Sequence, residues 1–117
     1  MSKVLAIDTS TSRSCVAIIE NGKVLYSGFR DGATAHGPSL PALVQEALEV
    51  SDVDEVVVGM GPGPFTGLRV GIAFAQSFAL ARQIPVRGVC SLDAIATQVK
   101  ENDFIITVDA RRKEVYW

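Results

Sequence analysis

The sequence predicts one α/β domain built on a mixed β-sheet. Three strand-like segments come first, with a tight turn between the second and the third. After them the apolar residues adopt helical spacing, and helical and strand-like segments alternate, which is typical of crossover connections and a partly parallel sheet. The chain has 117 residues, of which 48% are hydrophobic. That length and composition are enough for one domain with its own core.

The three opening strands are expected to pair in antiparallel succession. Lys3–Asp8 (KVLAID) is a short apolar run that ends in a carboxylate, Ser14–Glu20 (SCVAIIE) is a second strand, and Lys23–Arg30 (KVLYSGFR) is a third. Asn21-Gly22 between the last two is a strong signal for a two-residue hairpin turn.

The first helix is predicted over Leu40–Val50. Ser39 is its expected N-cap, and Pro41 is expected to be tolerated in the first turn. The residues with helical spacing are Leu40, Leu43, Val44, Ala47 and Leu48.

The rest of the chain continues to alternate. Asp54–Met60 is β-branched and apolar throughout, as expected of a strand covered on both faces. The later predicted elements are a helix at Gly67–Arg82 capped by Thr66, a strand at Pro85–Cys90, a helix at Ser91–Lys100, a strand at Phe104–Asp109 and a final strand beginning in Lys113–Trp117.

Composition argues against several classes of function. The net charge is −2 and the pI is near 5.3, whereas a chain that grips nucleic acid by itself usually has a basic patch. No apolar run is long enough for a membrane helix, and the N-terminus lacks the pattern of a signal peptide. Cys15 and Cys90 lie far apart and are expected to be buried and reduced, with a disulfide or a metal-binding pair as the alternative. His36 alone is a poor metal signal. These features predict a cytoplasmic protein.

A polar turn after the first strand is the first candidate site. It consists of Asp8, Thr9, Ser10 and Thr11. A carboxylate and three hydroxyls beside backbone N–H groups could receive phosphate oxygens or a hydrated metal ion. The alternative is an Asx or Ser/Thr turn that only joins two hairpin strands.

The segment GPGPFTGLR (Gly61–Arg69) is the second candidate. It leads from a strand into a helix, where backbone N–H groups attract anions. It is neither a P-loop nor a GxGxxG loop, and its prolines lack N–H donors, so a rigid elbow is the alternative. The elbow residues of interest are Gly61, Pro62, Gly63, Thr66, Gly67 and Arg69.

The helix Gly67–Arg82 is apolar on two sides, although a helix lying on a sheet needs only one apolar face. We expect one side to pack on the sheet and the other to meet a partner protein, with packing inside the domain as the alternative. The predicted partner interface comprises Leu40, Leu43, Val44, Ala47, Val70, Phe74, Ser77 and Ala81. No catalytic constellation is recognised.

Three segments together resemble the TsaB family, also called YeaZ. They are LAIDTST with the following CVAI, the elbow GPGPFTGLRVGIA and the late VDARRKEVYW. The resemblance implies a lobe of the ribonuclease-H-like, actin-like (ASKHA) fold group, whose members have two related lobes. Residues 1–117 then form a single N-terminal lobe, and the family's second lobe is expected to be missing from a truncated chain.

Comparison with the catalytic paralogue, TsaD, indicates that two motifs with a chemical role are missing from this chain. TsaD-like proteins have two metal-binding histidines four residues apart, where this chain has Ser91 and Ile95. They also have a glycine-rich SGGH turn near nucleotide phosphates, where this chain has Asp109-Ala110-Arg111-Arg112. No metal and no cofactor are therefore expected.

The resemblance implies a non-catalytic scaffold in the machinery that makes threonylcarbamoyladenosine in tRNA. TsaD would be the catalytic partner, TsaE would join the assembled complex, and the chain would also form a homodimer when alone. It would meet tRNA only indirectly and would have no membrane partner. Two alternatives stay open. One is an enzyme, either a nucleotide-dependent phosphotransferase lobe or a glycoprotease-like metallohydrolase, and the other is a direct RNA-binding module.

Overall fold

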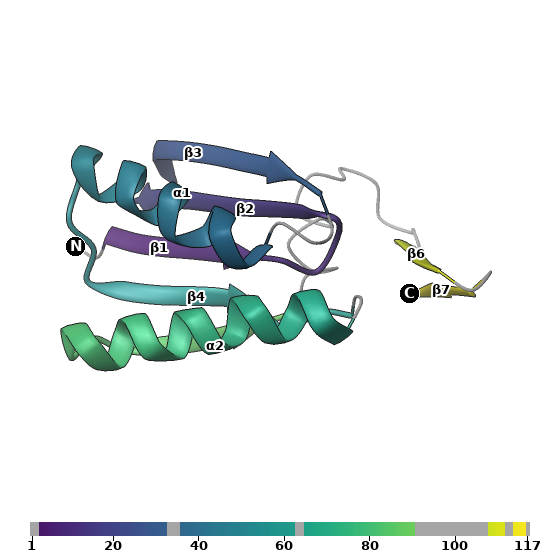
Figure 1. The fold of residues 1–117 in the computed structure, drawn as a ribbon. Coiled ribbons are helices and arrows are strands. Elements are labelled where there is room, and N and C mark those ends of the chain that lie inside the picture. Colours follow the sequence, from purple (N-terminus) through teal and green to yellow (C-terminus); the bar gives the residue numbers. More distant parts are fainter. Residues whose placement is uncertain (1–2, 33–35, 63–64, 91–107, 112–113, 117) are drawn as a thin grey trace, which may run out of the picture.

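The computed structural model describes residues 3–32, 36–62, 65–90, 108–111 and 114–116. Figure 1 shows the arrangement of the elements. They are β1 (Lys3–Asp8), β2 (Arg13–Glu20), β3 (Lys23–Asp31), α1 (His36–Val50), β4 (Glu55–Gly59), α2 (Phe65–Arg82), β5 (Val86–Val89), β6 (Val108–Arg111) and β7 (Glu114–Tyr116).

The main sheet has the strand order β3-β2-β1-β4-β5. β1 and β2 are antiparallel, as are β2 and β3, whereas β4 pairs parallel to β1 and β5 pairs parallel to β4. β6 and β7 form a separate antiparallel pair. The mixed α/β sheet predicted from the order of the segments is therefore confirmed.

The hairpin between β2 and β3 follows directly from two residues. Asn21 and Gly22 have φ angles of 52° and 75°, as a type I′ turn requires at both of its central positions. The ladder pairs Glu20 with Lys23, and its register shifts between Ile18 and Ile19. The turn predicted from Asn-Gly is confirmed.

The core lies on one face of the sheet. Alternate residues of β1, β2 and β4 point to that face, because successive side chains of a strand point to opposite sides. Helices α1 and α2 both cover it, α1 over β2 and β3 and α2 over β4 and β1 (Figure 1). The buried strand residues are Leu5, Ile7, Val16, Ile18, Val56 and Val58, and the buried helix residues are Leu40, Leu43, Val44, Ala47, Ala75 and Ala79.

The predicted start of α1 was wrong. The helix begins at His36, so Ser39 lies inside it instead of capping it. Pro41 is also inside the helix, beyond the first turn. Proline has no N–H to donate, so this position lacks one bond of the helical ladder. Burial of the neighbouring Leu40, at 0% exposure, holds this part of the helix on the sheet despite that loss.

The other element ends differ by small amounts. α2 begins at Phe65, so Thr66 belongs to its first turn and is not the cap. The predicted helix at Ser91–Lys100, and residues 104–107 of the strand predicted at Phe104–Asp109, lie outside the described residues. Among the residues that the structure describes, no helix is long and apolar enough to cross a membrane.

Glu46 ties α1 to the edge strand β3. Its carboxylate accepts a hydrogen bond of 2.9 Å from the Tyr26 hydroxyl and an ion-paired one of 3.2 Å from Arg30. Burial, and secondly the bond to Glu46, raise the pKa of Tyr26. The protonated phenol is therefore favoured in the folded chain, and the stability it contributes is lost as pH rises through the raised pKa.

Tyr26→Phe tests this link. At pH 7 the substitution should cost about 1 kcal/mol or less, because one partly exposed hydrogen bond is lost. Above about pH 10, the ordinary pKa of tyrosine, the native chain should lose stability that the variant never had, so the difference should shrink. Urea unfolding at both pH values measures it, with Ser27→Ala as the control. A difference that stays constant up to pH 11 contradicts the assignment.

Candidate functional site

The polar turn after β1 is closed by its own side chains. Asp8 Oδ1 accepts hydrogen bonds from the Ser10 N–H at 2.7 Å and from the Ser10 hydroxyl at 2.5 Å. Ser10 is only 4% exposed. Asp8 Oδ1 and the Ser10 hydroxyl, two groups that the sequence offered to a ligand, therefore bond to each other, in the manner of an Asx turn.

Thr9 connects the same turn to helix α2. Its side chain is 1% exposed, and its hydroxyl donates a hydrogen bond of 2.5 Å to the carbonyl oxygen of Gly67. Gly71, one helical turn later, packs directly on Thr9, since a Cβ at position 71 would come closest to the Thr9 hydroxyl oxygen and would lie 3.3 Å from both Thr9 Cβ and Thr9 Cγ2. The Thr9 hydroxyl thus points into the domain.

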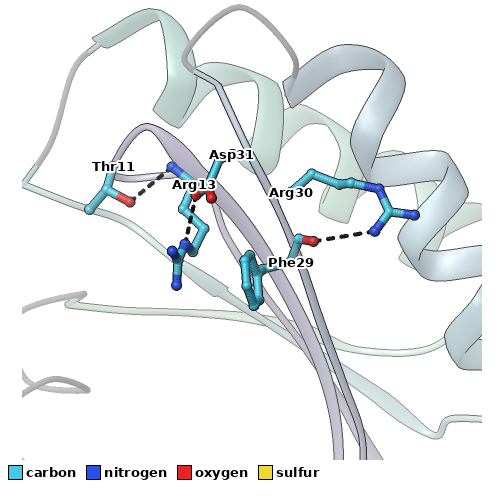
Figure 2. A network of polar contacts seen from close by, with 5 residues as sticks. All are labelled: Thr11, Arg13, Phe29, Arg30 and Asp31. Atoms are coloured by element: carbon cyan, nitrogen blue, oxygen red, sulfur yellow. Dashed lines mark hydrogen bonds and ion pairs between the residues drawn. The ribbon is translucent and has the colours of Figure 1, made fainter.

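The fourth turn residue, Thr11, belongs to a network with β2 and β3 that Figure 2 shows. The Arg13 N–H donates to Thr11 Oγ1 at 3.2 Å, and Arg13 Nε donates to Asp31 at 2.8 Å. The bond to Asp31 raises the pKa of Arg13. The guanidinium also lies 4.0 Å from the centre of the Phe29 ring. Arg13 is held by neighbours on its own sheet, and Arg30 points the opposite way, toward α1 (Figure 2).

A hollow of about 410 Å³ lies on the sheet face opposite to α1 and α2. Small side chains form its floor, and the polar groups stand at one end, near the turn after β1. Burial, and secondly the neighbouring Asp8, raise the pKa of the Cys15 thiol, so the thiol is protonated at neutral pH. The residues that shape the hollow include Ala6, Asp8, Cys15, Ala17, Phe29 and Gly59.

The elbow carries the chain from β4 into α2. Gly61 is buried and has a φ of 94°, a left-handed conformation that favours glycine. The peptide bond between Gly61 and Pro62 is cis. Thr66 and Arg69 are exposed and border a hollow of about 380 Å³ on α2, whereas Gly67 is buried beneath Thr9. Gly63 lies outside the described residues.

The structure divides the predicted partner interface into two groups. The α1 members Leu40, Leu43, Val44 and Ala47 are at most 3% exposed and form the core against the sheet. Their assignment to a partner surface was wrong, because the helical periodicity of α1 marks the side that faces its own domain. On α2, Ser77 and Ala81 are exposed, and Val70 and Phe74 are half-buried.

Phe74 lies at the edge of the core and is not a free surface residue. Its ring stacks on Phe78 with centroids 6.1 Å apart, and both rings pack against the buried cluster. The prediction missed Leu80, which is 81% exposed. Leu80 follows Ser77 by three positions, so both lie on the same side of the helix. That spacing was the signal that could have identified it.

The described residues contain no group of three or more His, Cys, Asp and Glu side chains placed to hold a metal ion. Ser91 and Ile95 lie outside the described residues, as does Arg112 of the predicted late turn, whereas Asp109, Ala110 and Arg111 belong to strand β6.

Comparisons with known proteins decide the family. The family model for TsaD, tRNA N6-adenosine threonylcarbamoyltransferase, matches residues 31–117. The chain belongs to this family. Its relatives include the TsaB protein of Escherichia coli strain K12, named as a tRNA threonylcarbamoyladenosine biosynthesis protein, which is 35% identical over 98% of this chain and 53% of the relative. The resemblance to TsaB is thus confirmed. The family model that matches the chain takes its description from TsaD.

Two further matches cover the whole chain. An uncharacterized protein of Mycobacterium tuberculosis strain H37Rv is 48% identical over 100% of this chain and 58% of its own length. The solved structure of YeaZ from Pseudomonas aeruginosa superposes with a TM-score of 0.86 at 34% identity, over 100% of this chain and 59% of that one. The actin-like fold expected of a TsaB-like lobe is confirmed. The chain spans less than two thirds of these relatives.

Asp8→Ala tests whether the first turn is held by its own carboxylate. The variant should lose about 1–3 kcal/mol of stability, because the nearly buried Ser10 N–H and hydroxyl lose their acceptor. Asp8→Asn keeps an acceptor oxygen and should lose less. Thermal unfolding of the three proteins measures the difference. An Asp8→Ala variant as stable as the native chain would contradict the geometry of the turn.

Proposed function

We propose that this chain is a non-catalytic subunit of the machinery that makes threonylcarbamoyladenosine in tRNA, and that it binds the catalytic TsaD. The family match and the names of the TsaB relatives supply the pathway. TsaE joins the assembled complex, a second copy replaces TsaD when the chain is alone, and tRNA is reached only through the complex. The place of action is the cytoplasm.

The observation that carries the non-catalytic role is the closed turn after β1. The Ser10 N–H and hydroxyl donate to Asp8, and the Thr9 hydroxyl donates to Gly67. An anion site needs N–H and O–H donors directed at the ligand. Here the donors described are already bonded inside the domain, which favours a turn that holds the fold together over one that receives phosphate.

The surface proposed for TsaD is the outer side of α2. It comprises Ala73, Ser77, Leu80 and Ala81, which are exposed, and the half-buried Val70 and Phe74 at its margin. Small residues let another helix approach closely, and a large apolar side chain among them is typical of an interface anchor. Leu80 is that side chain.

Leu80→Ala tests the surface. It should weaken the affinity for TsaD by about tenfold, or ~1.4 kcal/mol, because an apolar anchor is lost. The melting temperature should stay the same, since Leu80 is 81% exposed in the free chain and leucine and alanine both favour helices. Calorimetric titration of TsaD measures the affinity.

Val24→Ala is the matched control for Leu80→Ala. Val24 is 57% exposed on β3, away from α2, so its truncation should leave the affinity for TsaD unchanged. Unchanged binding by Leu80→Ala would exclude this side of α2 as the contact. Equal losses in both variants would show that the effect is not specific to α2.

Nucleotide binding separates the scaffold from the phosphotransferase. Titration of the chain with ATP and magnesium should give no binding tighter than about millimolar, a scale worth ~4 kcal/mol. The reason is that the Ser10 N–H, the Ser10 hydroxyl and the Thr9 hydroxyl already donate within the domain. A micromolar isotherm would overturn the non-catalytic assignment and favour the enzyme.

A further inference from the structure

We propose that Thr9 is a positioning residue, which sets the place of helix α2 on the sheet and thereby the place of the TsaD surface that α2 carries. This inference rests on the proposed function for its consequence. Its geometry rests on Thr9, Gly67 and Gly71 alone.

The buried residues of α2 that the structure describes are all small. Gly67, Gly71, Ala75 and Ala79 recur every four residues along the helix, and all four are buried. Glycine and alanine let the helix backbone lie close to the strands. They offer no bulky knobs that would fix the position of the helix along its axis, because ridges of large side chains are what normally set that register.

Thr9 supplies a fixed point on this side of the helix, in addition to the larger α2 side chains, such as Ile72 and Phe78, that pack at the edges of the core. Its hydroxyl donates to the carbonyl of Gly67. The same hydroxyl oxygen, together with the Cβ and the methyl group, fills the space against Gly71, one helical turn later. One side chain therefore holds two successive turns of α2, by a hydrogen bond at the first and by shape at the second. Thr9 is itself anchored at the end of β1, the central strand of the sheet.

A displacement at this point reaches the proposed contact surface. α2 has 18 residues and is therefore about 27 Å long. Its backbone hydrogen bonds make it move as a unit, so a shift or tilt at Gly71 also moves Ser77 and Leu80. Thr9 does not touch the partner and acts only through the helix.

The proposal is tested by enlarging the side chain at position 71 and then shortening the one at position 9 to compensate. Gly71→Ala puts a methyl group into the space of the Thr9 side chain, and we expect the affinity for TsaD to fall at least tenfold. Combining it with Thr9→Ala removes the Thr9 hydroxyl and methyl group and makes room for the new one. The double variant should recover to within about threefold of the native affinity.

Two single variants separate the contribution of the Thr9 hydroxyl from that of the shape of its side chain. Thr9→Val keeps the shape and loses the donor, and Thr9→Ser keeps the donor and loses the methyl group. Both should weaken TsaD binding less than Gly71→Ala does. Ile18→Val is the control, because it removes a methyl group from the core on β2, at a residue that is 0% exposed. It should lower the melting temperature and leave the affinity unchanged.

Amide hydrogen exchange of α2 gives a readout that needs no partner. Exchange across residues 67–81 should speed up in Gly71→Ala and return toward the native rate in the double variant. If the native chain does not bind TsaD, the proposed function fails, and the exchange rates still decide whether Thr9 positions the helix. The positioning role is overturned if Gly71→Ala leaves affinity and exchange as in the native chain, or if the double variant restores neither.

Discussion

The close approach of α2 to the sheet is the constraint on which the rest of this domain depends. The buried residues that the structure describes on α2 are all glycine or alanine, and the helix packs on β4 and β1 along that side. The large apolar side chains of α2 must then lie on its flanks or its outer side. Phe74 and Phe78 fill the flanks against the core, and Leu80 remains outside. The small residues on the buried side of α2 and the exposed Leu80 on its outer side therefore both follow from the close packing of the helix on the sheet.

Much of the fold could be predicted because its signals are local. Asn21-Gly22 requires positive φ at both positions and gave the hairpin with its register. Helical spacing of apolar residues identified α1 and α2, and the alternation of segments gave the mixed sheet. The ends of the helices were less predictable. Ser39 has the chemistry of a cap, but the helix begins at His36, and Ser39 lies buried within it.

The partner surface was the least predictable part, for a physical reason. Hydropathy reports that a side chain avoids water and does not report whether its own domain or another protein covers it. On α1 the apolar stripe is simply the core. On α2 small residues occupy the buried side, and the apolar Leu80 lies on the exposed side of the helix. Only the three-dimensional packing separates these two cases.

The polar turn after β1 shows that sequence alone also leaves the chemical role of a segment open. Asp8, Thr9 and Ser10 have the composition of an anion receptor, and the sequence left that reading open beside a purely structural one. What decides between them is the nearest acceptor of each donor. Asp8 is two residues from Ser10, but Gly67 is fifty-eight positions from Thr9. It is brought there by the parallel pairing of β4 with β1, since β4 leads through the elbow into the start of α2. A contact over that separation has no local sequence signal, and it joins the turn after β1 to the start of helix α2.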